Sequence, residues 1–343
     1  MNASSIVRQT ILRLAGLSVA CLGCIAVVFA DEPASRPLVP PDGGDLNELA
    51  VHPHAPLMVR SRPVIERLPV QVIEPVDLQV AQTGHIYVAD SGAQCIFRLD
   101  PFARVSLHSR DLAGLRRICL DSDESVYALT ASSGECSIHQ ITPEGRRLLL
   151  HTLPFPAQSF ARFGTTDWLV ADGGNIWSIN SEADRSLIFR SSVAVLDLCT
   201  DAGGGIAALL SDGQVLKIGA AGNAQLAGFA PGSPKRVICR ADGQLVVLAD
   251  ASLARNGAAA PLPRGLYALS KSAPAAEPDA IAHLPEGTEA AGFDSLGNLC
   301  LANPQLRAVT KVTSRFRIPC PHCRESVLMI FDANAQPDNI GGF

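Results

Sequence analysis

The chain has 343 residues, of which 47% are hydrophobic and only 18% are charged, and its formal net charge is −5. A chain of this length buries enough surface on folding to need neither disulfides nor a structural metal for stability. Only four lysines occur, at positions 217, 235, 271 and 311, and they form no cluster in the sequence. This balance provides no basic field for nucleic acid, so we expect no nucleic-acid partner.

The first thirty residues have the pattern of a secretory signal. Arg8 and Arg13 precede an apolar stretch over residues 14–30, and Asp31 opens a polar segment. A positively charged start, an apolar centre and small residues before a polar chain are typical of a cleaved signal peptide. We therefore predict a signal peptide over residues 1–30 and export to the periplasm, the cell envelope or the extracellular space.

Two alternatives remain for this segment. The apolar stretch reaches the lower length limit of a membrane span, so it could stay uncleaved as an anchor, and only then would the protein contact a membrane. Lipid attachment at Cys24 is the weaker alternative, because Cys21 stands where a lipobox has Leu. Residues 31–63, which follow, are rich in proline and polar residues and are predicted to form an extended spacer.

From about residue 64 the chain is built from a repeated unit. In its clearest copy, residues 77–92, an apolar strand, a turn at Gly84, a second alternating strand and another turn follow one another. Related turns recur about 40 residues apart, at Gly84, Ser125, Asp167, Gly205, Gly243 and Gly297. A third strand follows in each copy. One such antiparallel unit cannot bury its faces alone, so we predict that six units stack on one another over residues 64–318.

A closed ring of such units needs one strand from outside the simple repeat. Residues 63–72 and residues 325–331 are both suitable, and the sequence leaves the choice open. Closure couples the first and last units and protects their edges, so we expect one cooperative unit. We also expect a monomer. A longer interval before the sixth turn comes from residues 251–264, which are rich in Ala, Pro and Gly. We interpret them as a tolerated surface loop, with a lid or a partner-contact loop as the alternative.

The first unit resembles an NHL repeat. It reads Gly84-His85-Ile86-Tyr87-Val88-Ala89-Asp90-Ser91-Gly92 and continues as Ile96-Phe97-Arg98-Leu99-Asp100. NHL repeats are similar to the SMP-30/gluconolactonase and strictosidine-synthase-like propellers, so the resemblance, which covers residues 72–318, implies an all-β, six-bladed β-propeller. Later copies replace the Asp-x-x-Gly turn, for example by Asp123-Glu124-Ser125. A WD40 propeller is disfavoured because the Gly-His and Trp-Asp signatures of that blade are missing.

Charged residues gather just before the innermost strands, where the loops at one mouth of a propeller channel would lie. These residues are Asp77, Arg116, Arg117, Asp197, Lys235 and Arg236. Their mixed charge suits a polar ligand or a protein partner, although solvated loop positions are the simpler interpretation. No dinucleotide, phosphate-loop or nucleophile-elbow motif is present, so we expect no cofactor and favour binding over catalysis.

The alternative function is a metal-dependent hydrolase. Resemblance to the SMP-30 group implies a divalent metal held by Glu, two Asn and Asp, and Glu74 could supply the first ligand. The matching Asn positions are not found, since Gln158-Ser159, Leu196-Asp197 and Arg236-Val237 stand there. Without those oxygen ligands we expect no metal in the channel and no lactone hydrolysis.

Two groups among the ten cysteines suggest a structural or chemical role. Cys119, Cys199 and Cys239 occupy similar places in three innermost strands, where we expect them to pack near the axis as small apolar residues. Cys320-Pro321-His322-Cys323 lies in a C-terminal tail over residues 319–343. In an exported protein we predict a disulfide between Cys320 and Cys323, with redox catalysis or metal binding as alternatives.

Overall fold

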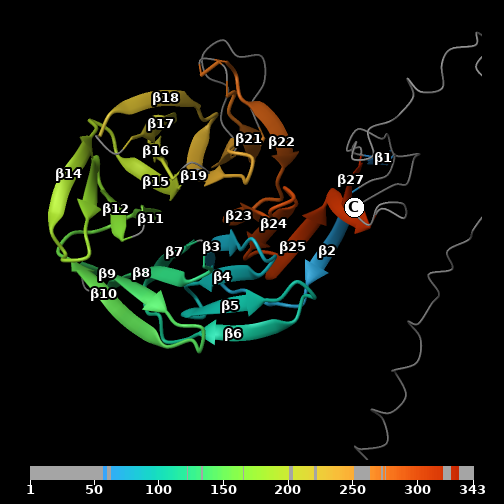
Figure 1. The fold of residues 1–343 in the computed structure, drawn as a ribbon, viewed down its shortest axis with the longest axis horizontal. Coiled ribbons are helices and arrows are strands. Elements are labelled where there is room, and N and C mark those ends of the chain that lie inside the picture. The colour runs from blue at the N-terminus through green and yellow to red at the C-terminus, as the bar shows by residue number, and fades with distance from the viewer. Residues whose placement is uncertain are drawn as a thin grey trace, which may run out of the picture. The chain divides into compact units, whose positions relative to one another are not determined.

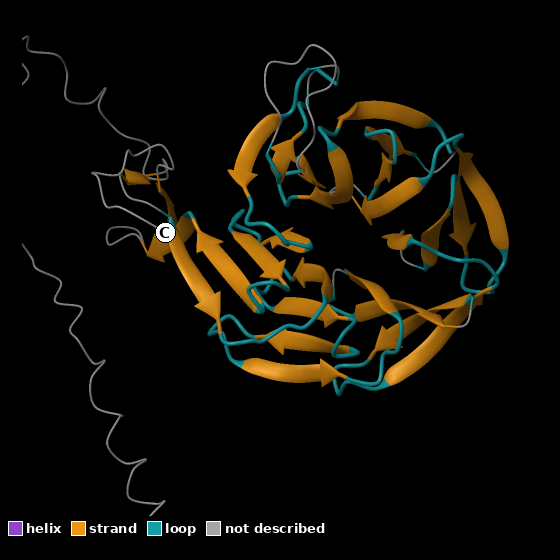
Figure 2. Cartoon of the chain, turned by 180° about the vertical axis from the view of Figure 1, so that it is seen from behind, coloured by secondary structure: helices purple, strands orange, loops and turns teal. Residues whose placement is uncertain are grey.

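The structure is a computed structural model, and it describes residues 57–59, 63–121, 123–132, 134–164, 166–200, 204–219, 222–250, 263–271, 273–274, 276–319 and 326–331. All regular elements within these residues are β-strands (Figure 2). No helix in this part of the chain is long and apolar enough to cross a membrane. The predicted signal peptide, nearly all of the spacer, most of the inserted loop and the predicted Cys320–Cys323 disulfide lie outside the described residues.

Six four-stranded antiparallel sheets surround a central axis, which confirms the predicted six-bladed β-propeller (Figure 1). Blade one contains β3 (Pro75–Val80), β4 (Ile86–Asp90), β5 (Cys95–Leu99) and β6 (Val105–Ser109). Blade two contains β7 (Leu115–Leu120), β8 (Val126–Ser132), β9 (Glu135–Ile141) and β10 (Arg147–Leu153). Blade three contains β11 (Ser159–Phe163), β12 (Asp167–Asp172), β13 (Asn175–Ile179) and β14 (Arg185–Arg190).

The remaining blades continue this order around the ring. Blade four contains β15 (Val195–Thr200), β16 (Ile206–Leu210), β17 (Gln214–Ile218) and β18 (Ala224–Phe229). Blade five contains β19 (Ser233–Cys239), β20 (Leu245–Asp250), β21 (Gly265–Ala268) and β22 (Asp279–His283). Blade six contains β23 (Ala290–Phe293), β24 (Leu299–Asn303), β25 (Ala308–Thr313) and β2 (Val64–Leu68). The innermost strand of each blade lies next to the axis; these strands are β3, β7, β11, β15, β19 and β23.

The core lies between neighbouring blades. Every residue of β4, β16 and β24 is buried, because the second strand of a blade is covered on both faces. One apolar cluster joins Tyr87 and Ala89 of blade one to Ile118 and Ala128 of blade two. Apolar packing in such clusters holds each blade against the next, as the near-continuous apolar runs of the sequence predict.

Strand β2 closes the ring. It pairs antiparallel with β25, with Val64 opposite Thr313 and Leu68 opposite Val309. Leu68 is buried in the cluster that joins blades six and one, whereas Ile65 on the same strand is 65% exposed. Of the two closing segments that the sequence left open, the N-terminal one therefore completes blade six.

The other segment has a different partner. Strand β27 (Ser326–Phe331) pairs antiparallel with β26 (Arg315–Pro319) and parallel with β1 (Leu57–Val59), which together form a separate three-stranded sheet. The last propeller strand thus ends at Thr313, and residues 315–318, which we assigned to the propeller, belong to this sheet. The physical reason is that β25 already pairs with β24 and β2, so the chain after it has no vacant position beside β25.

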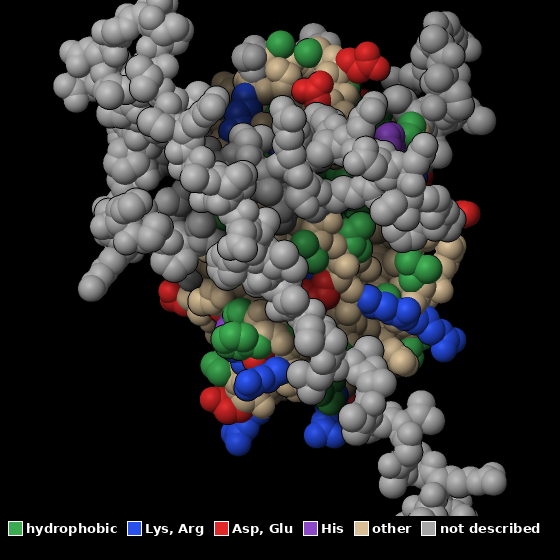
Figure 3. Space-filling model, turned by 90° about the vertical axis from the view of Figure 1, so that its right-hand side faces the viewer, with side chains coloured by type: hydrophobic (Ala, Val, Ile, Leu, Met, Phe, Trp, Pro, Cys, Tyr) green, Lys and Arg blue, Asp and Glu red, His purple; other side chains and the backbone are tan. Residues whose placement is uncertain are grey.

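Charges of both signs lie on the face of the molecule that Figure 3 shows. On the side shown in Figure 3, Lys and Arg side chains lie among Asp and Glu side chains rather than in one basic patch. This distribution accompanies the formal net charge of −5.

Candidate functional site at the channel mouth

The innermost strands of four blades carry a β-bulge near their first residues. The pairing register shifts between Pro75 and Asp77, and it does so at the corresponding places of β7, β15 and β19. The residues that occupy these shifts are Val76, Arg116, Leu196 and Lys235. A bulge turns a side chain away from the regular alternation. The bulge residues therefore lie at the rim of the mouth, whereas the residue that follows each bulge points into the channel.

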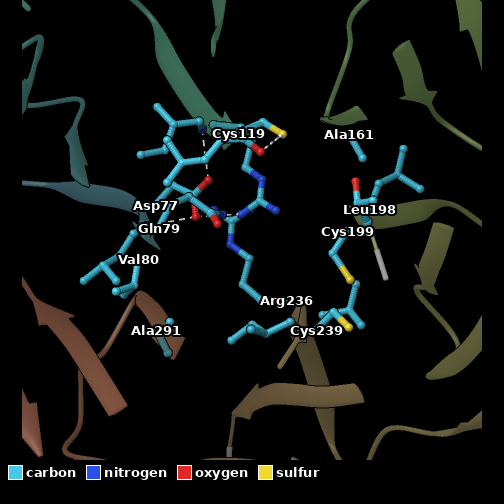
Figure 4. Close-up of a pocket in the computed structure, with 18 of the residues that line it drawn as sticks. Asp77, Gln79, Val80, Cys119, Ala161, Leu198, Cys199, Arg236, Cys239 and Ala291 are labelled. Atoms are coloured by element: carbon cyan, nitrogen blue, oxygen red, sulfur yellow. Dashed lines mark hydrogen bonds and ion pairs between the residues drawn. The ribbon is translucent and has the colours of Figure 1, made fainter. Parts of the chain in front are cut away.

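The residues that follow the bulges form a buried ion-pair network. Arg117 bridges two carboxylates, with 3.0 Å from its Nη1 to Oδ1 of Asp77 and 2.5 Å from its Nη2 to Oδ1 of Asp197. Arg236 reaches the same Asp197 oxygen at 3.7 Å and extends into the centre of the channel beside Asp77 (Figure 4). Asp197 is fully buried, and Arg117 and Asp77 are nearly so.

The charges of this network compensate one another. Burial disfavours the charged guanidinium of Arg117, but Asp197 and Asp77 outweigh this effect and raise its pKa above the usual value. Burial and the like charge of Arg117 lower the pKa of Arg236. Two acids therefore face two bases in the channel.

The same acids fasten neighbouring blades together. Oδ2 of Asp77 accepts a hydrogen bond from the backbone N–H of Ile118 at 3.0 Å, and Oδ2 of Asp197 accepts one from the N–H of Val237 at 3.0 Å. Between them, the Ser159 hydroxyl accepts from the N–H of Leu198. The predicted site residues Asp77, Arg117 and Asp197 are thus buried in the propeller interior, where they hold adjacent blades together.

Above this network lies a pocket of about 430 Å³, which we call the mouth pocket. Its lining residues are Glu74, Pro75, Val76, Leu196, Pro234, Lys235, Arg236 and Glu289. They come from the starts of the innermost strands of blades one, four, five and six. Of the predicted site residues, the structure brings Lys235 and Arg236 to this pocket and places the alternative metal ligand, Glu74, beside them.

A second charge cluster rims the pocket on the side of blades five and six. Nζ of Lys235 lies 3.0 Å from Oε2 of Glu289 and 3.2 Å from Oδ2 of Asp250. Arg264 pairs with both acids, at 3.0 Å from Asp250 and 3.4 Å from Glu289. Sequence analysis missed Glu289, Asp250 and Arg264. Glu289 could have been found, because it stands in the sixth unit where Lys235 stands in the fifth.

Two of the sequence-predicted positions differ from the rest. Arg116 is exposed, and its guanidinium donates a hydrogen bond to the backbone oxygen of Ala157 instead of lining the mouth pocket. Glu74 is also exposed, but its carboxylate has no hydrogen-bond or ion-pair partner among the described residues.

The lining of the channel interior includes three cysteines among mainly apolar side chains. A cavity of about 160 Å³ extends from the ion-pair network to Cys119, Cys199 and Cys239, which lie around it in Figure 4. Burial raises the pKa of Cys119 to about 11. In blade six the same level is occupied by Gly292, where an added Cβ would lie 2.9 Å from Leu78. Gly292 thus packs closely near the axis, as expected, whereas Cys119, Cys199 and Cys239 are partly buried and line the cavity.

Solved structures with the same fold include enzymes. A streptogramin B lyase is 10% identical to this chain, with a TM-score of 0.53 over 73% of this chain and 97% of the lyase. A virginiamycin B lyase from Staphylococcus aureus is 13% identical, with a TM-score of 0.52 over 74% and 99% of the two chains. A gluconolactonase from Xanthomonas campestris is 9% identical, with a TM-score of 0.52 over 77% and 99%. At such identities the likeness shows the propeller fold alone.

No family model and no curated protein sequence matches the chain. The NHL resemblance therefore stays a resemblance of the repeat unit, while the propeller architecture that it implies is confirmed. Within the described residues, no three His, Cys, Asp or Glu side chains are grouped so that they could hold a metal ion.

Proposed function

We propose that this protein is an exported β-propeller that binds a polar ligand, or a polar group of a protein partner, in the mouth pocket. The observation that carries the proposal is the pocket of about 430 Å³, whose lining combines Glu74, Lys235, Arg236 and Glu289 with proline and aliphatic side chains. A concave, partly apolar surface with a few fixed polar groups is the usual form of a ligand site.

The rigidity of the lining supports this role. Lys235 is held by Glu289 and Asp250, and Arg236 donates to the backbone oxygen of Val76. Polar groups that are already fixed lose little conformational entropy when a ligand binds. The buried ion-pair network lies in the channel next to the pocket, so we expect a ligand to be held on the solvent side of the network.

Binding agrees better with this lining than hydrolysis does. Metal-dependent hydrolysis requires oxygen or nitrogen ligands that hold a divalent ion with an activated water. The pocket supplies two carboxylates, and that of Glu289 is already paired with Lys235 and Arg264. A lactonase-like hydrolase remains the alternative that the experiment below would reveal.

Export is part of the proposal. Arg8, Arg13 and the apolar residues 14–30 have the order of a signal peptide, which supports a mature protein that begins near Asp31. Intact-mass measurement on natively expressed protein tests this. Retention of residues 1–30 on a membrane-bound form, or a lipid on Cys24, would contradict it.

A ligand-observed NMR screen tests the proposed site. The mature chain, residues 31–343, is mixed with amines, carboxylates, sugars and lactones, and bound compounds are identified by saturation transfer. Leu196→Trp should fill the pocket and abolish binding. The control is Leu187, which lies on the outer strand β14 and is 39% exposed; Leu187→Trp should leave binding unchanged.

Two results would contradict the proposal. One is binding that Leu196→Trp does not affect, because the ligand would then sit elsewhere. The other is enzyme-like consumption of a lactone in the presence of Ca²⁺ or Zn²⁺ that is lost on Glu74→Gln, because that result would support the hydrolase.

A further inference from the structure

We propose that the mouth pocket selects a cationic group, an ammonium or a guanidinium on an apolar stem, and that Glu74 is its counter-ion. The inference rests on the proposed function, because it names the chemistry that this same pocket would accept. It depends on the pairing of charges at the mouth, on the way the backbone presents Glu74, and on the apolar walls beside it.

The charges at the mouth and in the channel are almost completely paired. Each of four acids contacts at least one of four bases, the acids being Asp77, Asp197, Asp250 and Glu289 and the bases Arg117, Arg236, Lys235 and Arg264. Glu74 is the carboxylate in the pocket lining that has no partner among the described residues. Among the residues that the structure describes, the Glu74 carboxylate is therefore the acid of this lining that a ligand can take as its ion-pair partner.

An anionic ligand would have to compete for bases that are already engaged. Lys235 contacts two carboxylates, and Arg236 contacts Asp197 and the backbone oxygen of Val76. Displacing these partners would leave buried or half-buried groups unpaired, which costs more than a new surface ion pair returns. A cation meets no such competition at Glu74.

Hydrogen bonds to Asp90 and Ser91 fix the backbone at Glu74. The fully buried carboxylate of Asp90 accepts the N–H groups of Ile73 at 2.6 Å and Glu74 at 2.9 Å. The Glu74 carbonyl accepts the N–H of Ser91 at 2.9 Å. The adjoining turn packs so closely that a Cβ on Gly92 would lie 3.0 Å from Cβ of Glu74. Glu74 is therefore presented at the mouth on a rigid support, as a binding residue requires.

The walls next to Glu74 suit the stem of such a ligand. Pro75, Val76, Leu196 and Pro234 provide apolar surface in the same pocket. Long cationic groups bury their methylene stems along apolar surface while the charged end keeps a polar partner. A free alkylamine and the side chain of a Lys residue in a peptide share this chemistry.

Calorimetric titrations at low ionic strength test the inference on the mature chain. The probes are n-butylamine, butyrate and butanol, which share a stem and differ in charge. Wild-type protein should bind n-butylamine more tightly than the other two, and Glu74→Gln should weaken binding of the amine about two- to fivefold, the range for an exposed ion pair. Raised salt should weaken it in the same direction.

A charge reversal and a matched control sharpen the test. Glu74→Lys should reverse the preference, so that butyrate binds more tightly than n-butylamine. Glu182→Gln, in the exposed turn between β13 and β14, should change neither affinity. A wild-type preference for butyrate, or an amine affinity that Glu74→Gln leaves unchanged, would overturn the proposal.

Further measurements distinguish a free amine from a Lys side chain as the source of the cation. They also distinguish failure of the cation inference from failure of the proposed function. Tighter binding of the blocked peptide acetyl-Gly-Lys-Gly-amide than of n-butylamine would indicate a protein partner, and the opposite order would indicate a free amine. If Leu196→Trp abolishes binding of a probe while Glu74→Gln does not, the pocket is the binding site and only the cation inference fails. If neither variant affects binding, the proposed function fails as well.

Discussion

At the scale of single residues, the buried charges of the channel pair with one another and stabilise the ring, and are not available to bind a ligand. Sequence analysis located Asp77, Arg117 and Asp197 just before inner strands, which was enough to place them near one end of the channel. It could not tell that they meet, because Arg117 lies 40 residues after Asp77 and 80 residues before Asp197, and the three residues belong to different blades. The bulges at Val76 and Leu196, which turn the next residues inward, have no marked sequence signal.

Removal of Arg117 should therefore be costly. Arg117→Leu leaves Asp77 and Asp197 buried without their main partner, so we expect the free energy of unfolding to fall by about 3–5 kcal/mol. Arg116→Leu is the matched control, because its exposed guanidinium makes one backbone contact; its effect should stay within about 1 kcal/mol. Denaturant unfolding measures both, and equal effects would contradict the network's role.

The Cys119 thiol should react slowly. Burial raises its pKa from 9.0 to about 11, so at pH 8 its thiolate fraction is roughly a hundredfold lower than for an ordinary thiol. Because the pKa of this thiol is higher in the folded than in the unfolded protein, the unfolded state loses the proton first. The thiol's contribution to the free energy of unfolding is therefore fully present below pH 9 and is lost as the pH rises towards 11. Alkylation of Cys119 by iodoacetamide, followed by peptide mass spectrometry from pH 7 to 10, should lag behind alkylation of a Ser192→Cys control, whose position between β14 and β15 is exposed. Rapid labelling at pH 7.5 would refute this.

At the scale of elements, the second strands were the easiest to predict and the fourth strands the hardest. Runs such as Ile206–Leu210 are buried on both faces and therefore apolar throughout. Outer strands such as β10 expose Leu148, Leu149 and Leu150, so their sequences do not alternate in a way that marks a face. The closing strand stayed ambiguous because strand-like segments lie on both sides of the repeats, at residues 63–72 and 325–331.

Closure by β2 predicts a contrast within one strand. Leu68→Ala removes a side chain that is 3% exposed in the cluster between blades six and one, so we expect a loss of about 2–4 kcal/mol in unfolding free energy. Ile65→Ala, at a position 65% exposed, should change it by less than about 0.5 kcal/mol. Chemical denaturation decides the matter. Comparable small losses for both variants would mean that β2 does not close the ring.

The small sheet gives the predicted Cys320–Cys323 disulfide a testable consequence. Pro319 and Ser326 are paired neighbours, so the two cysteines belong to the connection between β26 and β27. Closing so short a loop contributes only about 2 kcal/mol. The double variant Cys320→Ser/Cys323→Ser should therefore speed hydrogen exchange in β26, β27 and β1 while the propeller strands keep their protection. Global unfolding, or disulfide reductase activity in the parent that the variant loses, would contradict a structural disulfide.

At the scale of the whole molecule, a closed ring held together by interblade contacts carries the mouth pocket at the end where its inner strands begin. The repeat made the ring predictable, since each unit must bury its faces against the next. The pocket was only partly predictable: Lys235, Arg236 and Glu74 were identified, while Asp250 and Arg264 were not, because their position depends on how blade five meets blade six.

The most direct test of the account is a crystal structure of the mature protein with the best ligand from the screen. We predict the ligand in the mouth pocket, with its cationic group beside the Glu74 carboxylate and its stem against Pro75 and Leu196, while the Asp77–Arg117–Asp197 network below stays intact. A ligand bound on the outer strands or at the opposite opening of the channel would contradict the account.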